Sequence, residues 1–112
     1  MTHPIDALFQ VVSSRKGGDA DSSYTAGLFQ RGTPVIARKV GEEAVETVVE
    51  ALSGSKQSLT SESADLLYHL LVLWADGGVD PQDVWDELSK RAGTSGLEEK
   101  ASRGSNPIDK EG

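Results

Sequence analysis

The sequence predicts an all-α protein, a bundle of four to five helices. Apolar residues recur at helical spacing in several segments, and these segments begin at polar caps followed by proline and end at glycine. No segment reads convincingly as a strand. Because 112 residues suffice for one modest core, we expect a single domain over residues 1–103, followed by a disordered polar tail at residues 104–112.

The first expected helix begins at Thr2 or His3, before a proline that is typical of a first turn. Its buried stripe consists of Ile5, Leu8, Phe9 and Val12. Residues 13–22 are rich in glycine and aspartate and lack apolar periodicity, which indicates a loop. A short helix capped by Ser22 or Ser23 should follow.

Two long helices are expected in the middle of the chain. The first begins at Thr33-Pro34 with the threonine as its cap, and the second is capped by Ser58 or Thr60. Their short connection favours antiparallel packing. The apolar residues of the first long helix should face the core; they are Val40, Ala44, Val48 and Ala51, flanked by Val45 and Leu52. A last helix begins at Asp80-Pro81.

Both long helices carry acidic residues on one face. Residues three and four apart share a helix face, so Glu46 lies beside Glu42 and Glu43, and Glu62 pairs with Asp65. Like charges at this spacing oppose helix formation by roughly 0.2–0.5 kcal/mol per pair, so the cluster needs open solvent or a cation. An antiparallel hairpin would bring both sets to a comparable height, and we interpret them as holding a divalent cation. Spacing alone leaves a solvated row of surface glutamates as the alternative.

The composition limits the ligands and partners. The chain has no cysteine, so a metal must be held by oxygen or imidazole, and carboxylate oxygens suit Mg²⁺. A formal charge of −7 makes the chain a poor non-specific binder of nucleic acid. No apolar run approaches the roughly 20 residues that span a membrane. We therefore expect a cytoplasmic protein without nucleic-acid or membrane partners.

Four strings in the sequence resemble one known family, the phosphoribosyl-ATP pyrophosphohydrolases of histidine biosynthesis. This family lies within the all-α nucleoside triphosphate pyrophosphohydrolases, which include the MazG-like proteins, and the acidic signature alone indicates only that larger group. The resemblance runs from about Ile5 to Arg103. The strings are Ser-Tyr-Thr-Ala at residues 23–26, Lys-Val-Gly-Glu-Glu-Ala at 39–44, Ala-Asp-Leu-Leu-Tyr-His-Leu-Leu-Val-Leu at 64–73 and Ser-Gly-Leu-Glu-Glu-Lys-Ala-Ser-Arg at 95–103.

The resemblance implies an activity and a set of site residues. The activity is the Mg²⁺-dependent hydrolysis of phosphoribosyl-ATP, a small nucleotide, to phosphoribosyl-AMP and pyrophosphate, with Mn²⁺ as an alternative ion. The implied metal ligands are Glu43, Glu46, Glu62 and Asp65. Glu42 and Glu43 are the implied catalytic residues, with Glu42 as a further ligand, a supporting group or the base. The implied substrate-binding residues are Arg38, Lys39, Lys100 and Arg103.

Other functions fit parts of the same pattern. A housekeeping pyrophosphohydrolase acting on ordinary nucleoside triphosphates would share the acidic signature. A non-catalytic metal-binding bundle is a further alternative, although di-iron bundles usually carry Glu-x-x-His on two helices and this chain has no such motif. The last alternative is a helical module that binds another protein and whose acidic face is only solvated.

Two expectations concern the apolar helix that follows Asp65. The apolar density of residues 66–74 exceeds what one small bundle readily covers, and the family resemblance likewise implies dimers, so we expect a homodimer. His69, a lone histidine in this helix, is interpreted as a packed and hydrogen-bonded residue rather than a metal ligand. No stacking partner for the adenine base can be assigned from the spacing of the aromatic residues.

Overall fold

The computed structural model describes residues 3–92, which form five α-helices and no strand. This confirms the predicted all-α class. The chain divides into two compact units, one ending at Pro81 and the other beginning at Gln82. The predicted tail and the fourth family string lie outside the described residues. The helices are α1 (Pro4–Ser14), α2 (Tyr24–Arg31), α3 (Thr33–Ser53), α4 (Lys56–Gly77) and α5 (Pro81–Ala92).

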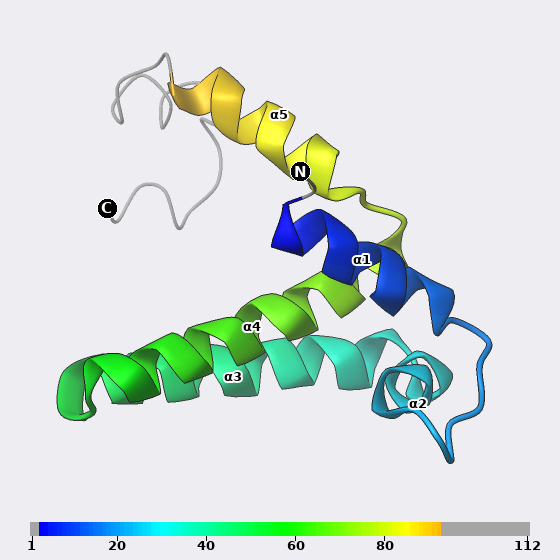
Figure 1. The fold of residues 1–112 in the computed structure, drawn as a ribbon, viewed down its shortest axis with the longest axis horizontal. Helices are drawn as coiled ribbons and strands as arrows, with labels where there is room; N and C mark the ends of the chain where they lie inside the picture. The colour runs from blue at the N-terminus through cyan, green and yellow to red at the C-terminus, as the bar shows by residue number, and fades with distance from the viewer. Residues whose placement is uncertain (1–2, 93–112) are drawn as a thin grey trace. The chain divides into compact units, whose positions relative to one another are not determined.

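Helices α3 and α4 form an antiparallel hairpin, in which they lie side by side along their lengths (Figure 1). Thr33 at the start of α3 donates a hydrogen bond from its hydroxyl to Asp76 near the end of α4. Further along the hairpin, the Thr47 hydroxyl lies 3.3 Å from the backbone carbonyl oxygen of Glu62. These two contacts show the register of the hairpin and confirm the expected antiparallel direction.

The start of α3 differs from the prediction. Gly32 is the residue before the first turn, and its φ of +92° is a left-handed value that favours glycine. No side chain caps the helix there, because the Thr33 hydroxyl is bonded to Asp76 across the hairpin. The prediction that Thr33 caps α3 is therefore wrong, although the position of the helix start is right to within one residue.

The other caps follow the expected chemistry, with one shift. The Ser23 side chain accepts the backbone N–H of Ala26 and caps α2, as predicted. Helix α4 begins earlier than predicted, because Ser55 and Ser58 form a reciprocal capping box. The predicted candidate Ser58 thus belongs to the cap, but as the third residue of the helix rather than as the residue before it.

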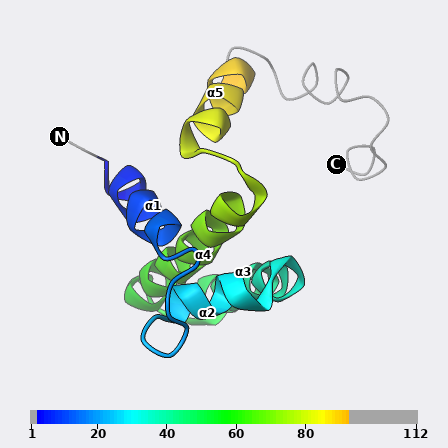
Figure 2. The ribbon, with the colours of Figure 1, turned by 90° about the vertical axis from the view of Figure 1, so that its right-hand side faces the viewer.

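The core lies where α1 and α2 pack against the hairpin. Both helices sit at the end where α3 begins and α4 ends (Figures 1 and 2). Each fully buried aliphatic side chain there contributes roughly 1.5–3 kcal/mol, so this end of the hairpin carries most of the stabilisation. Phe9 and Leu8 of the predicted α1 stripe pack against the cluster. The buried cluster consists of Val12, Leu28, Ile36, Val72 and Ala75.

The second half of α3 carries an apolar face that residues 3–92 leave exposed. Val45 is 63% exposed, Val48 is 58% exposed and Leu52 is 83% exposed. The expectation that these residues face a core within the chain is wrong. The reason is the placement of the shorter helices, because α1 and α2 both pack at the other end of the hairpin.

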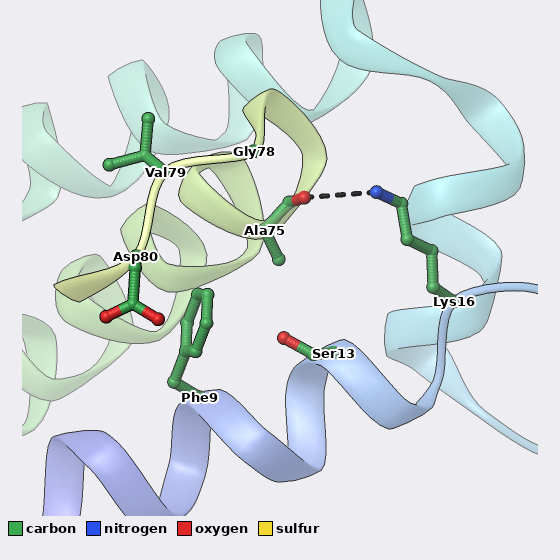
Figure 3. Close-up of a pocket in the computed structure, with 7 residues that line it drawn as sticks. All are labelled: Phe9, Ser13, Lys16, Ala75, Gly78, Val79 and Asp80. Carbon is green, nitrogen blue, oxygen red and sulfur yellow. Dashed lines mark hydrogen bonds between the residues drawn. The ribbon is translucent and has the colours of Figure 1, made fainter.

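A lysine from the loop after α1 binds the last turn of α4 (Figure 3). The Lys16 ammonium donates to the backbone carbonyl oxygen of Ala75 at 3.1 Å, and it lies 5.7 Å from the centre of the Phe29 ring. The carbonyl groups of the last helical turn lack partners within the helix, and a cation suits the negative end of the helix dipole. Beside this contact, a cavity of about 250 Å³ opens between the end of α1 and the residues that follow α4.

Helix α5 carries charges that suit its own dipole. Asp83 lies in its first turn, and Lys90 and Arg91 lie in its last turn. The guanidinium Nε of Arg91 pairs with Glu87 one turn earlier at 3.2 Å. Across residues 3–92, no helix is both long and apolar enough to cross a membrane.

Candidate metal centre

Three carboxylates from the two hairpin helices converge. Glu43 comes from α3, and Glu62 and Asp65 come from α4. One carboxylate oxygen from each lies within 4.8 Å of the others. Thr47, one turn after Glu43, hydrogen-bonds the Glu43 carbonyl oxygen at 2.8 Å and lies within reach of the Glu62 carbonyl oxygen. The antiparallel hairpin thus brings together residues from both acidic sets.

Two of the three converging carboxylates each have one buried oxygen without a partner. Oε2 of Glu43 and Oε2 of Glu62 are both sealed from solvent, and neither has a hydrogen-bond partner in the described part of the chain. A buried carboxylate oxygen without a partner is costly, because it loses its hydration and gains nothing in return. Carboxylates in this condition are normally paired with a cation or protonated. This observation distinguishes the cluster from a row of solvated surface glutamates.

The electrostatics agree with the geometry. Burial, a hydrogen bond with Glu46 and the negative charges of Glu46, Glu43 and Asp65 together raise the pKa of Glu62 to about 7. Burial is also the largest cause that raises the pKa of Glu43, followed by the hydrogen bond with Glu46 and its charge. The charge of His69 acts in the opposite direction on the Glu43 pKa. The cluster therefore favours taking up positive charge.

The donor set fits a hard divalent cation. All converging groups are carboxylate oxygens, and the two unpartnered oxygens would both be satisfied by one ion between the helices. Mg²⁺ and Mn²⁺ prefer such ligands, whereas sulfur and imidazole suit softer ions. Glu46, which interacts with both Glu43 and Glu62, lies beside the three converging groups. Three of the four predicted metal ligands therefore converge, and Glu46 interacts with two of them without belonging to the converging set.

Glu42 lies in a different electrostatic environment from its neighbour Glu43. Its carboxylate pairs with Arg38 at 3.7 Å and with Lys39 at 3.6 Å, both on the preceding turn of α3. It is not among the residues whose ligand atoms converge. Two of the predicted substrate-binding residues therefore stand one turn before the cluster, held by an exposed acidic partner. The other two, Lys100 and Arg103, lie outside the described residues.

Sequence reasoning did not find the tyrosine that approaches this region. His69 is buried, and its Nδ1 lies 2.8 Å from the backbone carbonyl oxygen of Asp65. Its Nε2 lies 3.0 Å from the Tyr24 hydroxyl. His69 is thus packed and hydrogen-bonded, in agreement with its interpretation from the sequence. The only sequence signal for Tyr24 was its presence in the first family string, which carried no role.

The antiparallel hairpin and its carboxylate cluster agree with the class that the acidic signature indicated, the all-α nucleoside triphosphate pyrophosphohydrolases. Comparison with known proteins narrows the class. The chain matches the family described as phosphoribosyl-ATP pyrophosphohydrolase over residues 5–92. The chain therefore belongs to this family, which confirms the resemblance found in the sequence.

Individual relatives agree with the family match. The phosphoribosyl-ATP pyrophosphatase of Azospirillum brasilense is 61% identical over 99 residues, which cover 88% of this chain and 89% of the relative. The protein of the same name from Paramagnetospirillum magneticum is 64% identical over 99 residues, covering 88% of this chain and 91% of the relative. The protein of the same name from Parvibaculum lavamentivorans is 59% identical over 100 residues, which cover 89% of this chain and 92% of the relative.

Proposed function

We propose that this chain hydrolyses phosphoribosyl-ATP to phosphoribosyl-AMP and pyrophosphate in histidine biosynthesis, with a divalent cation held between α3 and α4. Membership of the family supports the reaction. The observation that carries the metal site is the pair of buried, unpartnered oxygens on Glu43 and Glu62. The proposed ion is Mg²⁺, with Mn²⁺ as a substitute. Because the substrate is built from ATP, we assign the activity to the cytoplasm.

The four carboxylates Glu43, Glu46, Glu62 and Asp65 would hold the ion. Glu43 and Glu62 provide the oxygens that have no other partner, and Asp65 contributes a third oxygen within reach. The charge of Glu46 raises the pKa of both Glu43 and Glu62, so Glu46 lies close to both. A bound Mg²⁺ would supply charge neutralisation for the polyphosphate and an oriented water for the attack. The chain's own contribution is to keep these oxygens at fixed positions on two packed helices.

Arg38 and Lys39 would bind the phosphates. Their present partner, Glu42, is a half-exposed carboxylate at 3.6–3.7 Å, and exposed pairs of this kind are worth at most about 1 kcal/mol. A triphosphate carries more charge than one carboxylate, so both cations can turn from Glu42 to the substrate. Released from its pair, Glu42 becomes available to accept a proton from water. Lys100 and Arg103 stay predictions, since they lie outside the described residues.

Phosphorus NMR tests the proposed reaction. Purified protein with Mg²⁺ should release pyrophosphate from phosphoribosyl-ATP, and a chelator should stop the release. ATP and dATP serve as comparison substrates. Release from these two nucleotides at a similar rate would contradict the assignment in favour of a housekeeping pyrophosphohydrolase.

Matched variants test the proposed metal ligands. Glu46→Gln and Asp65→Asn remove charge at nearly constant volume, so the helical circular dichroism should persist while turnover falls by at least about a hundredfold. Asp6→Asn is the control, because Asp6 lies in the first turn of α1 and bears no relation to the cluster. Undiminished turnover of both cluster variants at saturating Mg²⁺ would contradict the site.

The exposed stripe on α3 supports the expected homodimer. Val45, Val48, Val49 and Leu52 are all at least half exposed and recur at helical spacing, so they form one apolar face. A second copy of the same hairpin would cover this face with its own stripe. We therefore expect Val48→Asp to lower the mass measured by sedimentation. An unchanged dimer in that variant, or a monomeric parent protein, would count against this arrangement.

A further inference from the structure

Tyr24 has an exposed ring whose orientation is fixed. Its side chain belongs to a residue that is 56% exposed, and it is the one exposed aromatic residue within residues 3–92. Phe9, Phe29 and Tyr68 are at least partly covered. An exposed tyrosine normally moves between rotamers, whereas this one is held by its hydroxyl group.

The hydrogen bonds of His69 determine how Tyr24 is held. A backbone carbonyl oxygen can only accept, so Nδ1 of His69 carries the proton and donates it to Asp65. In the neutral ring, Nε2 is then an acceptor, and the Tyr24 hydroxyl donates to it at 3.0 Å. Without that hydroxyl, a buried nitrogen would lose its partner. The rings of Tyr24 and His69 meet edge to face, with centroids 5.9 Å apart.

A second contact anchors the same turn of α2. The next residue, Thr25, is buried and hydrogen-bonds the hydroxyl of Tyr68 through its own hydroxyl. Two consecutive residues at the start of α2 are therefore tied to two consecutive residues of α4. The Tyr24 hydroxyl is bonded to His69 and the next residue anchors the turn, while Tyr24 stays 56% exposed.

The ring lies beside the carboxylate cluster. One residue, His69, separates Tyr24 from the backbone of the proposed ligand Asp65. His69 is also close enough to Glu43 to interact with that carboxyl electrostatically. A nucleotide whose phosphates lie at the cluster therefore has a fixed aromatic face within reach of its base.

We propose that the ring of Tyr24 is the platform on which the adenine base of the substrate stacks, an inference that rests on the proposed placement of the phosphates at the carboxylate cluster. In phosphoribosyl-ATP, the added ribosyl group sits on N1 of the adenine. The edge that proteins commonly read by hydrogen bonding is therefore blocked, and the flat face of the base is left for recognition. Substitution at N1 also makes the base electron-poor, which favours contact with the electron-rich face of a tyrosine.

Three substitutions separate the ring from its hydroxyl. Tyr24→Leu removes both, and we expect its KM for phosphoribosyl-ATP to rise about tenfold, as is typical for loss of one stacked base, with kcat changed less than about threefold. Tyr24→Phe keeps the ring and loses only the bond to His69, so its KM should stay within about threefold of the parent value. Tyr24→Trp should likewise retain a low KM. KM does not depend on the folded fraction, so partial unfolding cannot imitate the expected pattern.

Mn²⁺ affinity, measured by electron paramagnetic resonance without substrate, completes the test. It should be the same in all three variants and the parent. Equal KM values for Tyr24→Leu and the parent, or for Tyr24→Leu and Tyr24→Phe, would overturn the stacking role. Weaker Mn²⁺ binding by Tyr24→Leu would overturn it too, because the residue would then act by supporting the cluster. Full activity of Glu46→Gln would instead contradict the proposed metal site, whatever KM values the Tyr24 variants show.

Discussion

Cation binding at the cluster should release protons, and the amount should depend on pH. The surroundings of Glu62 raise its pKa to about 7, so at pH 7 this carboxyl is half protonated in the metal-free protein. A cation and a proton compete for the same oxygen, so binding should release about 0.5 proton from Glu62 at pH 7. The same pKa predicts about 0.9 proton at pH 6 and about 0.1 at pH 8. The raised pKa of Glu43 adds to the release at the lower pH values.

Titration calorimetry measures the number of protons released when the cation binds. Mn²⁺ is titrated into metal-free protein in several non-coordinating buffers, and the slope of the heat against the ionisation enthalpy of the buffer gives the protons released. Apparent affinity should rise from pH 6 to pH 8 as the competition fades. Asp6→Asn should behave as the parent, since Asp6 is exposed on α1. A release that is zero, or that is the same at pH 6 and pH 8, would refute the interpretation of the cluster as a site shared by proton and metal.

Three further predictions concern stability. The folded-state pKa of Glu62 is raised from 4.5 to about 7. Its stabilising effect on the metal-free protein is therefore full below about pH 4.5 and is lost as the pH rises through about 7. The melting temperature in the presence of chelator should fall over that pH range, and Glu62→Gln should make the fall smaller. Lys16→Met should lower the free energy of unfolding in urea by about 1 kcal/mol, because the Ala75 carbonyl loses its shorter hydrogen bond and keeps only the 3.4 Å contact from the Gly78 N–H. Gly41→Ala should raise the free energy of unfolding by about 0.5–1 kcal/mol, because nothing lies within 4 Å of the added methyl group and alanine has a higher helix propensity than glycine. A decrease in the free energy of unfolding would show that this position is packed in solution.

Local sequence signals predicted the helices well and their caps unevenly. Ser23 was found because its cap is made within four residues, by its own side chain and the N–H of Ala26. Thr33 was misassigned because Asp76, a residue from the other end of the hairpin, takes its hydroxyl. A cap is a competition between near and distant partners, and the sequence shows only the near ones.

The sequence likewise predicted some features of the candidate site and missed others. Helical spacing predicted that two acidic sets, one on each long helix, lie at a comparable height. The structure brings three members of these sets together, Glu43, Glu62 and Asp65. Spacing did not separate Glu42 from this set, because residues three and four positions before Glu46 both lie on its helix face. The pairing of Glu42 with Arg38 and Lys39 separates them. The apolar period of α3 was likewise read correctly as a stripe, but a period does not reveal whether the same chain covers it.

The hairpin holds its carboxylates together by means that lie outside the cluster. Thr47 is the one described hydroxyl that reaches both helices beside the site, and it has a single proton for two acceptors. The shorter contact, 2.8 Å to the Glu43 carbonyl, lies within α3, so this proton does little to join the helices. The separation of α3 and α4 at the site is therefore determined by apolar packing at the end covered by α1 and α2, and by whatever covers Val48 and Leu52 further along. A second copy on that stripe would consequently tighten the spacing of the proposed metal ligands, so a variant that dissociates the proposed dimer should bind Mn²⁺ more weakly even though no proposed ligand is changed.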